Sequence, residues 1–252
     1  GTGNKRPMKR RTGKEGFTLI ELLVVIAIIA ILASLVVGLS GMAGRKSTES
    51  RVKAELEAIK TAIGAYKEKF GHYPPDNPDT PILNGLYYEL TGVLYSSTRG
   101  TFKDPMSGNV MDPKLIKEHF GVDGFVNGSK TEGELKKFYE PRPENVRHIS
   151  EEHDEDDEGH GHKSHHSDEV HLLCVPSPWP ISRDDQPVRH HGKVAKGINP
   201  WRYVSSGPVN NVQQYDLWAE YVVGDEVWVI SNWKSEPFPK AQLSRYYKKK
   251  LR

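Results

Sequence analysis

The chain has 252 residues, of which 35 are basic and 33 acidic, with a formal charge of +2 at pH 7. Residues 1–16 hold six of the basic and one of the acidic residues, so the remainder carries 29 and 32 and a formal charge of −3. The basic character is confined to the N-terminus, so no nucleic-acid partner is expected. The single cysteine, Cys174, excludes an internal disulfide framework, and its apolar neighbours predict a buried thiol.

The first strong pattern is an apolar run from Leu22 to Leu39, interrupted by Ser34 and Gly38. As a helix rising ~1.5 Å per residue, this run covers ~27 Å, close to the hydrocarbon thickness of a bilayer. The six basic residues before the run predict that the N-terminus stays in the cytoplasm. We therefore expect a single-pass inner-membrane protein with its globular part in the periplasm or outside the cell.

Glu21 is an acid at the edge of this apolar run. A carboxylate in an apolar segment costs several kcal/mol, which indicates a functional role with a charged partner. Thr18-Leu-Ile-Glu21 also fits a capping box, which is the alternative explanation for the acid. Capping does not explain why a basic leader ending in glycine precedes it.

Residues 16–21 read Gly-Phe-Thr-Leu-Ile-Glu, after a basic leader that begins at Met8. This string resembles the processing site of the type IV prepilin superfamily, which includes type IV pilins and the pseudopilins of type II secretion systems. The resemblance implies cleavage after Gly16 by a prepilin peptidase and methylation of the new amine on Phe17. It also implies that Phe17 and Glu21 act in filament assembly, where the Glu21 carboxylate attracts the N-terminal ammonium of a neighbouring subunit. Residues 1–16 would then be the leader.

Residues 17–44 are predicted to form the transmembrane and filament-core helix, and residues 45–71 an amphipathic helix that continues it. Apolar residues recur in the second segment at alternating steps of four and three, which is typical of one buried helix face. Gly71 and the following Pro74 and Pro75 end the helix. The stripe consists of Val52, Leu56, Ile59, Ile63, Tyr66 and Phe70. A single helix of more than fifty residues resembles the N-terminal helix of pilins.

The remainder, residues 72–252, is predicted to be a globular domain. Short helices are expected at residues 83–91 and 113–120. Strands are expected at residues 201–204, 215–223 and 227–230, which predict an antiparallel sheet. Together with the long N-terminal helix packed on this sheet, the pattern indicates an α+β fold.

The order of the C-terminal motifs resembles the major pseudopilin of type II secretion systems. These motifs are Asn199-Pro-Trp, Ser206-Gly-Pro, Tyr215-Asp-Leu-Trp and Ile230-Ser-Asn-Trp. The resemblance implies a calcium ion near the last strands, with Asp216, Asp225 and Glu226 as candidate ligands. However, Asn199 replaces the expected aspartate and the loop is short. Because calcium takes six to eight oxygens, a plain turn at Asp225 and Glu226 is the favoured interpretation.

An insertion at about residues 141–169 is rich in acids and histidines and is expected to be solvated and mobile. Seven acids lie between Glu151 and Glu158. The four histidines His160, His162, His165 and His166 follow. Imidazoles at this spacing can chelate zinc or nickel, although no cysteine accompanies them. A plain loop is favoured over a specific metal site.

No nucleophile elbow, metalloprotease motif, phosphate loop or dinucleotide fingerprint is present in the sequence, so no enzymatic activity is expected. We expect a structural subunit of a type II secretion pseudopilus or a related pilus-like filament. Its expected partners are other copies of the chain, the prepilin peptidase, an inner-membrane assembly platform and minor pseudopilins. The alternatives are an adhesive or DNA-uptake pilin, and an uncleaved membrane-anchored metal-binding domain that uses the histidine-rich loop.

Overall fold

The computed structural model describes residues 18–77, 79–149, 169–177, 189–190, 193–194, 197–223, 226–245 and 247. The side chains of residues 35–45, 189–190 and 193–194 lie outside this description. The chain divides into two compact units, Gly1–Lys46 and Ser47–Arg252. The α+β prediction is confirmed, with an N-terminal helix and antiparallel sheets.

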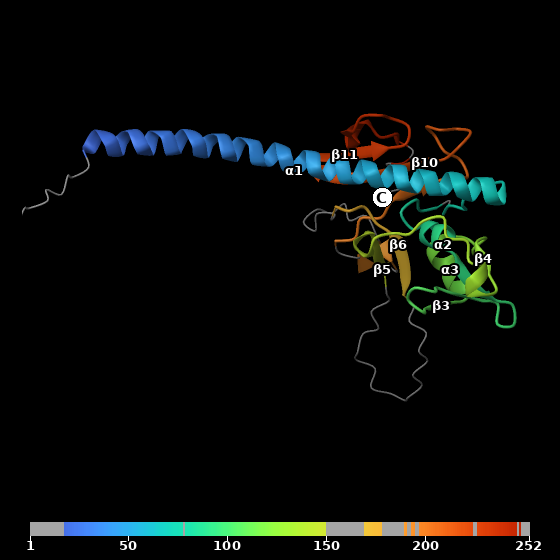
Figure 1. Cartoon of the computed structure of the whole chain (residues 1–252). Helices are drawn as coiled ribbons and strands as arrows, with labels where there is room; N and C mark the ends of the chain where they lie inside the picture. The colour runs from blue at the N-terminus through green and yellow to red at the C-terminus, as the bar shows by residue number, and fades with distance from the viewer. Residues whose placement is uncertain are drawn as a thin grey trace, which may run out of the picture. The chain divides into compact units, whose positions relative to one another are not determined.

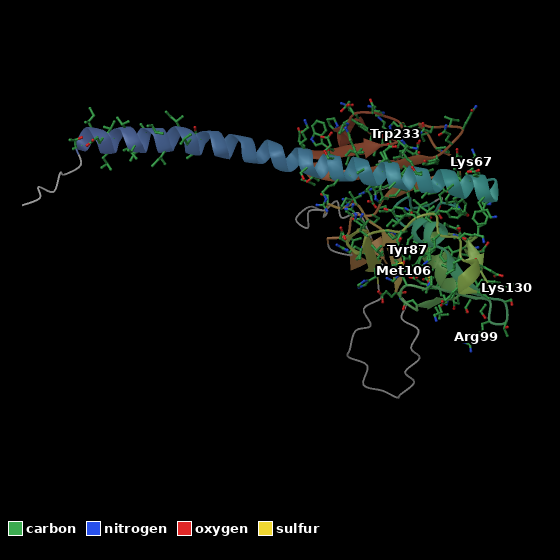
Figure 2. The ribbon with its side chains drawn as sticks, viewed as in Figure 1. Lys67, Tyr87, Arg99, Met106, Lys130 and Trp233 are labelled. Carbon is green, nitrogen blue, oxygen red and sulfur yellow. The ribbon has the colours of Figure 1, made fainter. Side chains whose placement is uncertain are left out.

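The described part of the first unit is the start of helix α1, whose bounds are Leu19–Phe70 (Figure 1). Every side chain from residue 18 to residue 34 is exposed, including a long series of leucine, isoleucine and valine residues (Figure 2). No helix in the part of the chain that the structure describes meets the length and apolarity required of a membrane span.

The second unit begins with the amphipathic part of α1. Val52, Leu56, Ile59, Ile63 and Tyr66 are at most 4% exposed and belong to the main hydrophobic core. This confirms the predicted stripe. The helix ends at Phe70, where the backbone N–H of Gly71 donates to the carbonyl of Lys67 at 2.8 Å. Gly71 has a φ of +82°, a conformation that glycine adopts without a steric penalty.

Two short helices and a small sheet follow α1. Every residue of α2 is buried, and α3 begins at a cap in which the Asp112 carboxylate accepts from Leu115 N at 2.7 Å. The sheet order is β3-β2-β1-β4, antiparallel except for the parallel β1–β4 pair. The elements are α2 Leu86–Thr91, β1 Val93–Ser96, β2 Thr101–Lys103, β3 Val110–Met111, α3 Pro113–Phe120 and β4 Gly128–Ser129.

The C-terminal sheet is antiparallel throughout, in the order β12-β11-β10-β9. Strand β10, one of the two central strands, buries side chains on both faces. Leu217, Ala219 and Tyr221 join the main core, whereas Trp218 joins a second cluster that includes Tyr247. The strands are β9 Arg202–Val204, β10 Asp216–Val223, β11 Glu226–Ser231 and β12 Phe238–Pro239. Three of them match the predicted strands to within one residue at each end.

Strand β5 of a two-stranded ribbon lies within the range assigned to the insertion, and its partner β6 directly follows that range. Residues 143–149 form the 3-10 helix η2 and strand β5, so regular structure continues further than the sequence analysis expected. β5 pairs antiparallel with β6, and β7 with β8. The remaining elements are η1 Glu132–Glu134, η2 Pro143–Asn145, β5 Val146–Ile149, β6 Val170–Leu173, β7 Arg189–His190, β8 Lys193–Val194 and η3 Lys240–Gln242.

Truncating the stripe of α1 tests how strongly this helix holds the second unit together. We expect Ile59→Ala, at a side chain that is 0% exposed, to lower the free energy of unfolding by about 2–5 kcal/mol, because it leaves a cavity. Ala58→Ser, on the exposed side of the same turn, should change it by less than about 0.5 kcal/mol. Urea unfolding of the full chain in detergent, followed by circular dichroism, measures both; equal effects would contradict the packing described.

Candidate functional site

The candidate processing site lies at the start of α1. Gly16 and Phe17 fall outside the described residues, and Thr18 is the first residue that the structure describes. Thr18 N and Thr18 Oγ1 donate to Glu21 Oε2 at 2.9 and 2.7 Å, and Glu21 N donates to Thr18 Oγ1 at 3.3 Å. The capping box is therefore formed.

The geometry of this cap leaves part of Glu21 available. Both bonds from Thr18 go to Oε2, and Oε1 makes no hydrogen bond to another described residue. The helix that follows displays exposed aliphatic side chains, from Leu19 at 81% to Val25 at 45%. A carboxylate oxygen at the head of an uncovered apolar helix surface is a site at which a cation on an apolar partner would bind.

Asp216, a predicted calcium ligand, accepts several hydrogen bonds from a neighbouring loop. Its side chain is 0% exposed and accepts bonds from the backbone N–H groups of Val209, Asn210 and Asn211 at 2.8–2.9 Å. The Asn210 side-chain amide and the Tyr247 hydroxyl also donate to it. A carboxylate with five donors around it anchors the 209–211 loop to β10.

The predicted calcium ligands are not brought together. Asp216 begins β10, whereas Glu226 begins β11 and pairs with Val223 at the far end of the β10–β11 hairpin. Along β10, Asp216 is seven residues from Val223, which is the partner of Glu226. At ~3.3 Å per residue, the backbone positions of the two acids are therefore ~23 Å apart. Asp225 lies outside the described residues. Among the residues with described side chains, no group of three His, Cys, Asp or Glu is arranged to hold a metal ion.

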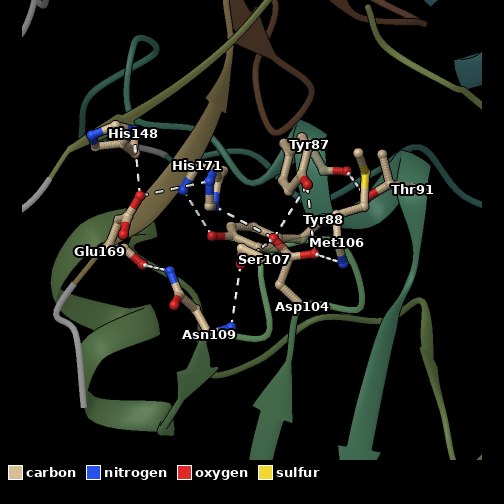
Figure 3. Close-up of polar contacts among 10 residues, drawn as sticks. All are labelled: Tyr87, Tyr88, Thr91, Asp104, Met106, Ser107, Asn109, His148, Glu169 and His171. Carbon is tan, nitrogen blue, oxygen red and sulfur yellow. Dashed lines mark hydrogen bonds and ion pairs between the residues drawn. The ribbon is translucent and has the colours of Figure 1, made fainter. Parts of the chain in front are cut away.

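The four histidines of the candidate zinc or nickel loop, His160, His162, His165 and His166, also lie outside the described residues. The ribbon on either side of them is described, and it carries His148 and His171 opposite each other. These side chains meet Glu169 and Asp104 in one polar cluster (Figure 3). Sequence reasoning missed Asp104 in this cluster because more than sixty residues separate it from His171 along the chain.

Asn199, which stands where the resemblance expects an aspartate, is buried and acts mainly as a donor. Its side-chain amide nitrogen donates to the carbonyls of Ser177 at 2.9 Å and Glu220 at 2.7 Å, and its oxygen accepts from Arg202 at 2.7 Å. Aspartate has no side-chain N–H to donate, so the asparagine fits this environment.

Cys174 is the single cysteine of the chain. Burial raises the pKa of its thiol to about 12, which makes the thiol unreactive.

Comparison with known proteins gives one match. A family model described as the prokaryotic N-terminal methylation motif matches residues 11–37, which contain Gly16, Phe17 and Glu21. No curated protein and no solved structure matched the chain. The match supports a type IV pilin-like precursor of the kind that a prepilin peptidase processes and that forms filaments.

A substitution at Asp216 distinguishes a loop anchor from a calcium ligand. Asp216→Asn should lower the free energy of unfolding by about 2–3 kcal/mol, because buried donors lose a charged acceptor. The loss should be the same with EGTA and with millimolar calcium, and Asp79→Asn, at an exposed acid, should have little effect. Differential scanning fluorimetry of the full chain measures the shifts; a loss confined to calcium-containing buffer would instead identify Asp216 as a ligand.

Proposed function

We propose that this chain is a structural subunit of a type II secretion pseudopilus, processed after Gly16 and polymerised through α1. The observation that carries the proposal is the methylation-motif match at residues 11–37, joined to the uncovered apolar surface of α1 that begins beside Glu21. An apolar helix of this kind needs a covering, which a membrane supplies before assembly and neighbouring helices supply afterwards.

The proposed assembly step pairs the amine of Phe17 in one subunit with Glu21 in the next. An ammonium and a carboxylate attract strongly in apolar surroundings, while either charge alone is heavily penalised there. The pair would therefore fix the register of helices that otherwise slide along uniform apolar surfaces. Within the described residues Oε1 of Glu21 makes no hydrogen bond, so this pairing can form without loss of the Thr18 cap.

The choice of a pseudopilus over an adhesive or DNA-uptake pilin rests on the C-terminal motifs. Asn199-Pro-Trp, Tyr215-Asp-Leu-Trp and Ile230-Ser-Asn-Trp occur in the order that resembles major pseudopilins. The first directly precedes β9, the second covers the start of β10, and the third covers the end of β11. We propose a mechanical rather than a catalytic role, with the inner membrane as the site of insertion. Deleting the gene in its host should cause secreted proteins to accumulate in the periplasm; loss of adhesion or DNA uptake alone would favour a pilin.

Mass spectrometry of the protein from its native membrane tests the processing step. We expect the mature chain to begin at N-methylated Phe17, because cleavage falls after Gly16. A chain that still carries Met8 to Gly16 would overturn the proposal. The Gly16→Glu variant should retain the leader, because a bulky charged residue occupies the cleavage position.

A matched pair of variants separates the two roles of Glu21. Glu21→Gln keeps the capping box, since glutamine can replace glutamate in it, but removes the charge. It should lower subunit affinity by more than ~100-fold, because an unpaired buried charge costs about 3–5 kcal/mol. Thr18→Ala removes the cap at a cost of about 1 kcal/mol and keeps the charge, so filaments should persist. Filament yield by electron microscopy is the measurement; a Glu21→Gln variant that forms filaments as well as the wild type would leave Glu21 only a capping role.

A further inference from the structure

The ribbon formed by β5 and β6 carries two histidines directly opposite each other. His148 on β5 is paired with His171 on β6, and their rings lie 6.3 Å apart between centroids at an angle of 68°. Glu169, just before β6, approaches both rings, with its Oε1 3.3 Å from His148 Nδ1 and 3.8 Å from His171 Nε2. One carboxylate is therefore shared by two imidazoles.

His171 is also held against the first sheet and α2. Its Nδ1 lies 3.4 Å from Asp104 Oδ2, and its ring packs on Tyr87 at 5.4 Å between centroids. Its backbone N–H donates to the Tyr88 hydroxyl at 2.8 Å. These contacts join β6 to α2 and to the turn after β2, which are distant in sequence but adjacent in Figure 3.

Asp104 already has other donors. Met106 N and Ser107 Oγ donate to it at 2.9 and 3.0 Å, and the Tyr87 hydroxyl donates at 3.2 Å. The pKa of Tyr87 is raised by burial and by Asp104, so this donor stays protonated. His171 Nδ1 makes no hydrogen bond within the described residues. Asp104 therefore offers His171 a nearby charge without a hydrogen bond.

We propose that His148, His171, Glu169 and Asp104 form an acid-sensitive clasp, which holds the β5–β6 ribbon to α2 and the turn after β2 when His171 is neutral and releases it on acidification. The groups that face His171 in the described residues are Asp104 from the turn, Glu169 and His148 from the ribbon, and Tyr87 and Tyr88 from α2. The inference does not depend on the proposed filament function.

The direction of the effect follows from the balance of these groups. Burial lowers the pKa of His171 and His148 lowers it further, while Asp104 and Glu169 act in the opposite direction without restoring the ordinary value. An open ribbon exposes His171 to water, where it binds a proton near pH ~6.5. The open state thus binds the proton more tightly. The clasp is fully stable above about pH 6.5 and loses stability as the pH falls towards the pKa of the closed state.

Hydrogen exchange on the full chain in detergent tests the clasp. Between pH 7.5 and pH 5, after correction for intrinsic exchange, the opening constant of peptides that cover residues 146–149 and 170–173 should rise several-fold. Peptides from β10 and β11 should not change. His171→Gln should abolish the pH dependence, while His72→Gln, at an exposed imidazole outside the cluster, should preserve it. A ribbon that opens equally at both pH values in the wild type would overturn the proposal.

Two further measurements keep the test decisive if His171→Gln opens the ribbon at every pH. Removing the nearby buried charge with Asp104→Asn should depress the pKa of His171 further and so enlarge the pH-dependent change in opening. Direct titration of the His171 ring by NMR in the wild type should give a pKa below the ordinary value. A measured pKa at or above the ordinary value would overturn the proposal whatever the variants do.

Discussion

The second unit depends on the burial of one helix face. The stripe from Val52 to Tyr66 lies in the same core as α2, one face of β10, and β6. No other described helix exceeds eight residues, and most of the described strands have four or fewer. Such short elements bury too little surface to persist alone. They gain stability because α1 gives them a common surface, so disruption of that surface affects elements far apart in the chain.

Buried polar groups then decide where the short elements lie on that surface. Glu89 of α2 is an example, since its carboxylate accepts from the Tyr66 hydroxyl on α1 and from the backbone of Val126 and Asn127. Asp216 anchors the 209–211 loop in the same way. Each of these acids is almost fully buried, and each links a regular element to a loop. Because a buried carboxylate is costly without donors, these bonds specify loop positions that apolar packing leaves open.

The sequence predicts the parts of this structure that periodicity controls. The four-and-three spacing from Val52 to Phe70 identifies the buried face of α1, and the short helix expected at residues 113–120 is α3. The short strands β1 to β4 contain too few residues for an alternating pattern to be recognised. The clustering of Asp104 with His171 depends on how the first sheet packs against the ribbon, and no local pattern reports that packing.

The candidate site likewise has a part that sequence patterns predict and parts that they do not. Its local part, the Thr18–Glu21 cap, follows from a motif of four residues, which the sequence offered as the alternative explanation for Glu21, and the cap is formed. Its long-range contacts do not follow from motifs. A motif identifies the residue type at a position, but it does not identify the residues that this side chain contacts in the fold. Asp216 occupies the Tyr-Asp-Leu position of pseudopilins, yet its oxygens are surrounded by donors from residues 209–211. Asn199 likewise donates to two carbonyls where an aspartate could only accept. The two positions share one feature: hydrogen-bond groups of the chain surround both side chains. The hydrogen bonds of Asn199 and Asp216 therefore help to hold the C-terminal sheet and its neighbouring loops in place.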